Sequence, residues 1–193
     1  ELAFGSGAHE AVRLGDGPGA FRLRGQIDRI DTAGRSAVVI DYKRSGGSVG
    51  AAAKAFEEGI DPQLPLYASA VERLFDLQVV GFEWVAAARR VRRGRWSEQA
   101  AALYGRRQEG TAPKALAHDE WRALLGDVVE RASNTVQAVR EGEHALQTVD
   151  AKRCGRCAYF HVCRTSFVRG RVPESAGDQD RAGAAGAADG AGA

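Results

Sequence analysis

Two aspartates and a lysine in this sequence stand where they could do chemistry together. Asp41 and Lys43 come at the end of the apolar run VVIDYK, residues 38–43, and Asp28 closes the shorter segment GQID. Successive side chains of a β-strand point to opposite faces, so we expect Asp41 and Lys43 on one face and Tyr42 on the other. A carboxylate and an ammonium group would then point the same way from a rigid element.

Asp28 and Asp41 are expected to end two neighbouring strands and to converge on a point that Lys43 also faces. Two carboxylates held close together repel each other unless a cation lies between them, and their hard oxygens favour Mg²⁺ or Mn²⁺. Such a metal polarises a phosphoryl oxygen and lowers the pKa of a bound water, while the lysine orients that water or stabilises developing charge. The chemistry indicated is phosphodiester hydrolysis. Taken alone, an aspartate and a lysine two residues apart are more often a surface ion pair worth about 0 to 1 kcal/mol.

A hairpin of two strands is expected to position these side chains. The segment FRLRGQIDRIDT, residues 21–32, alternates apolar and polar residues and predicts one half-buried strand. After a turn at GRS, the segment AVVIDYKRS, residues 37–45, predicts its partner. A short strand is expected earlier, at residues 2–4, within a Gly-rich region.

The elements expected after the hairpin are a flexible loop leading into a short helix (46–59), an amphipathic helix (61–75), a strand (79–88) and a longer helix (117–141). Asp61 is placed to cap the amphipathic helix, with Pro62 at its first position. The tail after about residue 172 has almost nothing to bury and predicts disorder.

The combination of GQID, VVIDYK and the helix start QLPLY resembles the PD-(D/E)XK nuclease superfamily, and within it the RecB-like branch. The resemblance covers about residues 20–86. It implies an α/β fold, a restriction-endonuclease-like core in which helices flank a mixed central sheet, and it implies DNA as the substrate. The N-terminal core helix of the branch, which carries a metal-binding histidine or glutamate, is missing: His9 lies in a Gly-rich stretch without helical pattern.

Carried over residue by residue, the resemblance implies that Asp28 and Asp41 bind Mg²⁺ or Mn²⁺ together with the main-chain carbonyl of Tyr42. It makes Lys43 the catalytic lysine. Gln63 and Tyr67, four residues apart and hence on one helix face, would order the site or contact the DNA backbone. Without the other motifs, the simpler interpretation is that Tyr67 packs and Gln63 is solvated.

Three cysteines, Cys154, Cys157 and Cys163, lie within ten residues in the spacing C-x₂-C-x₅-C. Clustered thiolates suit an iron–sulfur cluster or zinc, and His161 would be a cramped fourth zinc ligand. The spacing resembles the C-terminal motif of iron–sulfur RecB-like nucleases of the AddB/AdnB type and of CRISPR-associated exonucleases. That resemblance implies a [4Fe-4S] cluster whose fourth cysteine lies outside this chain. The remaining alternative is that all three cysteines are free.

The net charge of +2 over 193 residues does not by itself identify a polyanion-binding protein. Five arginines within residues 89–95, however, predict either a patch that faces phosphates or a solvated hairpin tip. No stretch reaches the roughly 20 apolar residues that span a bilayer, and no signal peptide is visible, so a cytoplasmic location is expected.

We therefore expect a nuclease domain over residues 1–168 and a disordered tail over 169–193, as the C-terminal part of a larger protein. The resemblance implies a bacterial helicase–nuclease in double-strand break repair and recombination, with a helicase domain in the same parent and a partner helicase–nuclease subunit. Two alternatives stay open: a catalytically silent module that binds DNA or serves as a scaffold, and a stand-alone exonuclease of the CRISPR-associated type.

Overall fold

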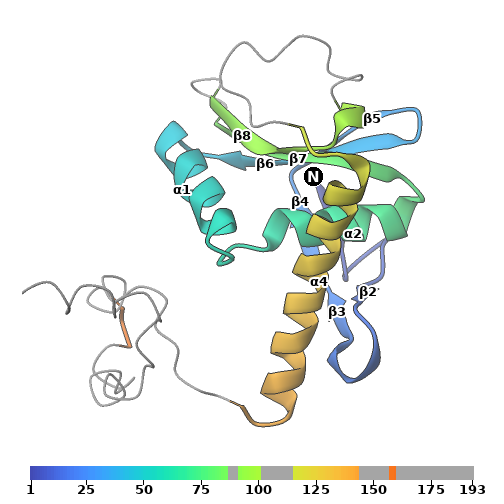
Figure 1. The fold of residues 1–193 in the computed structure, drawn as a ribbon, viewed down its shortest axis with the longest axis vertical. Helices are drawn as coiled ribbons and strands as arrows, with labels where there is room; N and C mark the ends of the chain where they lie inside the picture. The colour runs from blue at the N-terminus through green and yellow to red at the C-terminus, as the bar shows by residue number, and fades with distance from the viewer. Residues whose placement is uncertain (87–90, 101–114, 144–156, 160–193) are drawn as a thin grey trace, which may run out of the picture. The chain divides into compact units, whose positions relative to one another are not determined.

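A computed structural model describes residues 1–86, 91–100, 115–143 and 157–159 (Figure 1). The chain divides into two compact units, Glu1–Glu143 and His144–Ala193. In the second unit only residues 157–159 are described, and all three are exposed. The fold below is therefore that of the first unit.

A four-stranded mixed sheet forms the centre of this unit, in the order β5 (Arg29–Ala33), β6 (Ser36–Lys43), β7 (Gln78–Ala86) and β8 (Val91–Trp96). Strands β6 and β7 are parallel, and the other pairs are antiparallel. The connection from β6 to β7 runs through helices α1 (Gly46–Glu57) and α2 (Gln63–Phe75). Figure 1 shows these helices and α4 (His118–Arg140) on the same side of the sheet. This is the mixed α/β architecture predicted from the sequence, consistent with a restriction-endonuclease-like core.

The central strand β6 is buried on both faces, as expected for a strand with a parallel neighbour. Ala37 and Val39 pack into the core between the sheet and the helices, whereas Val38 and Ile40 pack into a second cluster with Trp96. The alternation predicted for this strand is therefore confirmed. By the same alternation Asp41 and Lys43 follow Val39 on the helix side, and Tyr42 follows Ile40 on the other.

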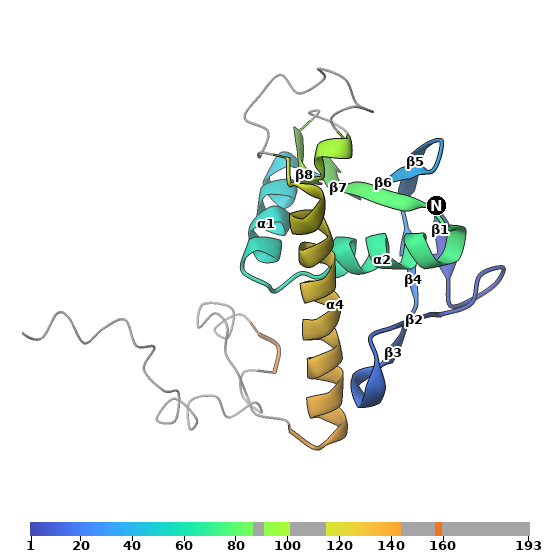
Figure 2. The same cartoon turned by 45° about the vertical axis from the view of Figure 1, so that its right-hand side comes forward.

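The single strand predicted over residues 21–32 is wrong, because the chain forms three short strands there. They are β3 (Phe21–Leu23), β4 (Gly25–Ile27) and β5, and they pair with β2 (Val12–Leu14), β1 (Leu2–Phe4) and β6. A 3₁₀ turn, Gly17–Gly19, lies between β2 and β3. Apolar and polar residues alternate from Phe21 to Asp28, and this pattern does not reveal that the partner strand changes between β3 and β4. The alternation shifts by one residue at Arg29, where β5 begins. Figure 2 shows β3 and β4 following one another toward the four-stranded sheet.

The flexible loop expected at residues 46–59 is also wrong in its first half, because α1 already begins at Gly46. The Ser45 side chain caps it by accepting the Ser48 N–H at 3.2 Å. Helix α2 begins one residue later than predicted, with Pro62 at its N-cap, and the Asp61 carboxylate accepts the Gln63 N–H at 3.1 Å. The sequence did not predict β8.

Strand β1 and helix α4 agree closely with the predicted segments. No helix in the described part of the chain combines the length and apolar character that a membrane span requires.

Candidate active site

Asp28 lies at the bend where the chain leaves β4 and enters β5. The next residue, Arg29, pairs with Ile40 of β6, so Asp28 stands one step further along, across from Asp41. The Oδ2 atom of Asp28 accepts the backbone N–H of Tyr42 at 2.7 Å. This hydrogen bond fixes the Asp28 carboxylate against the end of β6, beside the peptide whose carbonyl is the expected third metal ligand.

Asp41 and Lys43 form an ion pair on β6, with 2.7 Å between the lysine Nζ and Asp41 Oδ2. Their side chains are only 14% and 25% exposed, so the pair is more shielded from water than the surface ion pair of the simpler interpretation. The contact does not have hydrogen-bond geometry, and this buried Oδ2 has no aligned hydrogen-bond donor among the described residues. A buried carboxylate oxygen without a hydrogen-bond donor is uncommon in proteins, and a bound ion is one physical explanation of it.

Burial raises the pKa of Asp41 above its ordinary value. Lys43 opposes this increase, whereas the negative charges of Asp28 and Asp61 add to it. Asp61 was expected only as a helix cap, and its electrostatic effect on Asp41 shows that the start of α2 brings a third acid toward the site. No sequence signal distinguishes that effect from capping, because capping alone explains an aspartate at this position.

Tyr67 packs into a space that exists because residue 25 is glycine. A Cβ atom on Gly25 would lie 2.5 Å from the Tyr67 hydroxyl and 2.7 Å from its Cε1. The Tyr67 ring also meets Phe4 edge-on, with 5.6 Å between centroids and an interplanar angle of 82°. Gly25 and Phe4 are direct partners in the β1–β4 pair. Tyr67 of α2 therefore contacts the strand that ends just before Asp28.

The positions of Gln63 and His9 do not show a role for either side chain in the site. The Gln63 side chain lies on α2 one turn before Tyr67 and has no hydrogen bond among the described residues. His9 packs edge-on against Phe75 at 5.2 Å between ring centroids, which gives it a structural role at the end of α2.

The predicted cysteine site lies mostly outside the described residues, since Cys154, His161 and Cys163 are not described. Cys157 is exposed and forms no disulfide with any residue that the structure describes.

The arginine run of residues 89–95 is partly engaged within the protein. Arg92 forms a 3.0 Å ion pair with the buried Glu83, which also accepts the Trp96 Nε1–H at 3.0 Å. Arg95 pairs with Glu57 at 2.7 Å. Residues 87–90 are outside the described ranges. Arg92 and Arg95 thus have acidic partners that compete with any phosphate, whereas Arg93 forms no ion pair with a described residue.

The residues at the end of β6 fit a hard divalent cation. Asp28 and Asp41 supply carboxylate oxygens, the Tyr42 carbonyl directly follows Asp41 in the chain, and one Asp41 oxygen is buried without an aligned donor. Among the described residues, no three side chains of His, Cys, Asp or Glu are grouped closely enough to hold a metal on their own. An ion here would therefore use main-chain and water oxygens as well, as Mg²⁺ commonly does.

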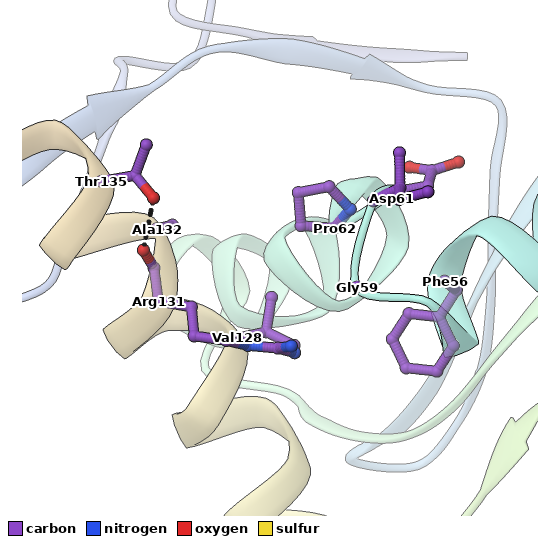
Figure 3. Close-up of a pocket in the computed structure, with 9 residues that line it drawn as sticks. Phe56, Gly59, Asp61, Pro62, Val128, Arg131, Ala132 and Thr135 are labelled. Atoms are coloured by element: carbon purple, nitrogen blue, oxygen red, sulfur yellow. Dashed lines mark hydrogen bonds between the residues drawn. The ribbon is translucent and has the colours of Figure 1, made fainter. Parts of the chain in front are cut away.

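A pocket of about 240 Å³ lies beside the Asp61 loop, between that loop and α4 (Figure 3). Figure 3 shows Asp61 and Pro62 on one side and Arg131 and Thr135 on the other. Asp28, Asp41 and Lys43 do not line it. The pocket is therefore separate from the candidate site.

Comparison with known protein families shows the superfamily to which the chain belongs. Residues 1–164 match the family model of the PD-(D/E)XK nuclease superfamily, and the chain belongs to this superfamily. Its members are nucleases that generally use divalent metals, so the chain is a nuclease domain, which implies DNA as the substrate. No solved structure matches the chain.

Proposed function

We propose that this chain is a metal-dependent deoxyribonuclease domain of the RecB-like branch, which hydrolyses phosphodiester bonds with Mg²⁺ or Mn²⁺. The observation that carries the proposal is the meeting of Asp28 and Asp41 at the end of β6, with Lys43 2.7 Å from Asp41. A shielded carboxylate whose pKa is raised by burial and by a neighbouring negative charge, as that of Asp41 is, is unfavourable in a structural role and common in an active site.

In this proposal Asp28 and Asp41 hold the metal through their carboxylates, and Tyr42 through its main-chain carbonyl. The bound metal supplies Lewis acidity to the phosphoryl group and a water of lowered pKa. The Tyr42 N–H holds the Asp28 carboxylate in place through Oδ2, so Oδ1 would remain available to a metal.

Lys43 has two roles in the proposal. It favours the ionised form of Asp41 and so opposes the rise in pKa that burial causes, since an ammonium 2.7 Å away stabilises the carboxylate. During hydrolysis it orients the attacking water or stabilises negative charge that develops on the phosphate. Gln63, one helical turn from Tyr67, contacts the DNA backbone, while Tyr67 orders the site through its contact with β4.

The test uses Asp41→Ala and Lys43→Ala in the full-length protein. Each variant should lose Mg²⁺-dependent cleavage of DNA while it keeps most of its DNA binding, because neither side chain is needed to hold the backbone. Asp127→Ala and Lys54→Ala are matched controls, since both residues are exposed and outside the site. Cleavage by either site variant at the wild-type rate would refute the assignment.

A silent module is the second candidate, and the lack of a third grouped acidic or histidine side chain in the described ranges favours it. Titration with Mn²⁺ discriminates between the two. An active domain should bind the ion with an affinity that Asp28→Asn and Asp41→Asn reduce, whereas a silent module should show no binding that depends on these residues.

The wider context is proposed from the sequence resemblance alone. We propose a nuclease domain at residues 1–168 with a tail at 169–193, within a cytoplasmic helicase–nuclease that repairs and recombines double-strand breaks together with a partner subunit. We also propose that Cys154, Cys157 and Cys163 bind a [4Fe-4S] cluster with a cysteine from outside the chain. Aerobically purified full-length protein should then be brown and contain iron; a colourless protein that contains zinc would contradict the cluster.

A further inference from the structure

The ribbon formed by β2, β3 and β4 carries arginines on the face that does not pack against the protein. In the β2–β3 pair Arg13 stands directly opposite Arg22, and both are exposed. Arg24 follows on the same side as Arg22, and Gln26 and then Asp28 continue the series at every second residue. The residues between them are buried or half-buried, including Leu23 and Ile27.

This placement is unfavourable for the isolated protein. Like charges directly across an antiparallel pair destabilise it, so the Arg13–Arg22 pair has a cost that a neighbouring carboxylate would usually relieve. Among the described residues no carboxylate forms an ion pair with Arg13, Arg22 or Arg24. By contrast, five other described arginines form such pairs: Arg29, Arg35, Arg92, Arg95 and Arg122.

The backbone at Gly5 also restricts the direction of the Arg24 side chain. Gly5 has φ +85°, and a Cβ there would lie 2.2 Å from the Cβ of Arg24. The base of the Arg24 side chain therefore passes over Gly5. Besides Asp28, the Glu1 carboxylate reaches this face, where it accepts the Gln26 side-chain N–H at 2.6 Å and so engages Gln26 and not an arginine.

We infer that Arg13, Arg22 and Arg24, the arginine face, bind the phosphate backbone of the DNA strand that leads to Asp28. The inference rests on the proposed function, which supplies the polyanion. At about 3.3 Å per residue, Arg22 and Arg24 are roughly 20 and 13 Å along the chain from Asp28. At about 3.4 Å per nucleotide this length corresponds to roughly six nucleotides of one strand. Guanidinium groups suit phosphate oxygens because they donate two parallel hydrogen bonds.

The test compares two double variants that each remove two positive charges. Arg22→Ser/Arg24→Ser alters the arginine face, while Arg35→Ser/Arg93→Ser alters exposed arginines on β8 and at the far end of the β5–β6 hairpin. Affinity for a fluorescent single-stranded oligonucleotide is measured by anisotropy in EDTA, so that no cleavage occurs, over a range of salt concentrations. A duplex of the same sequence forms a second arm.

The arginine-face variant should bind more weakly, and the slope of log affinity against log salt should fall by about 1.4 for the single strand, from about 0.7 for each lost phosphate contact. The control should keep the wild-type slope. The melting temperature of the arginine-face variant should be unchanged or slightly higher, because a repulsive pair is lost, so weaker binding would not reflect unfolding. Equal slopes in the two variants, or no DNA binding by the wild-type protein, would overturn the inference. The proposed function is judged separately, by whether Asp41→Ala abolishes Mg²⁺-dependent cleavage.

Discussion

Replacing Gly25 by alanine should show whether Tyr67 positions the strand that carries Asp28. The new methyl group would lie 2.5, 2.7 and 2.8 Å from the hydroxyl, Cε1 and Cζ of Tyr67, which is closer than atoms can approach. The φ of Gly25 is outside the left-handed region, so the backbone itself accepts alanine. We therefore expect Gly25→Ala to lower the free energy of unfolding by about 1 to 3 kcal/mol, and we expect this loss to come from overpacking alone.

A double-mutant cycle with Tyr67→Ala isolates this contact. In the Tyr67→Ala background the methyl group has free space, and alanine replaces glycine in a strand with a gain of about 0.5 to 1 kcal/mol. The two substitutions should then couple by about 1.5 to 4 kcal/mol, which overlaps the range of roughly 0.5 to 3 kcal/mol for residues in direct contact. Urea unfolding of the four proteins measures the coupling. Gly126→Ala is the control, because its Cβ would meet nothing within 4 Å and should stabilise α4 by about 1 kcal/mol.

The same four proteins should be titrated with Mn²⁺. If Tyr67 positions Asp28 through β4, Gly25→Ala should weaken metal binding and the double variant should recover part of it. A contact that only supports the fold would change the unfolding free energy without this recovery. Additive stability effects of the two substitutions would refute the reasoning, since they would mean that the Tyr67 ring does not occupy the space above Gly25.

Three further outcomes are expected from urea unfolding. Burial raises the pKa of Glu83 above its ordinary 4.5, although Arg92 opposes this rise. The stability that Glu83 contributes is therefore full below pH 4.5 and is lost as the pH rises through the pKa of the folded state. The Glu83→Gln variant should depend less on pH above 4.5 than the wild type does. Arg92→Met should destabilise more than Arg93→Met, by about 1 kcal/mol, because it leaves the buried Glu83 without its cation; equal effects would contradict this. Trp121→Phe should cost about 1 to 3 kcal/mol, since it removes the 2.8 Å hydrogen bond to the buried Val79 carbonyl, and a smaller loss would show that water replaces it.

The sequence predicted the sheet and its two faces because strands that are buried, such as β6, consist mainly of apolar residues. The prediction from the sequence failed where one residue pattern is compatible with two different structures. The alternation continues from β3 into β4 while the chain exchanges β2 for β1 as its partner, so these two strands look like one, whereas the two successive polar residues Asp28 and Arg29 mark the start of β5. The arginines of β8 made that segment look like an exposed tip, although Arg92 and Arg95 lie along a paired strand and bind acids.

At the candidate site, the sequence identified residue types but not their supports. The motif residues Asp28, Asp41 and Lys43 could be found from spacing and resemblance. The hydrogen bond from Tyr42 to Asp28 and the space above Gly25 depend on distances between strands, which no local pattern contains. The influence of Asp61 on Asp41 was hidden for the same reason, since a capping residue and a neighbour of the site look alike in a sequence.

The change of partner strand at Asp28 gives this residue an unusual dynamic setting. On one side of it are two-stranded pairs of three residues each, which open easily, and on the other is the long, doubly buried β6. Backbone amides of β2 to β4 should exchange with deuterium faster than those of β6 and β7. An ion held by Asp28 and Asp41 together would join the two regions, and added Mn²⁺ should slow exchange in the short strands most of all.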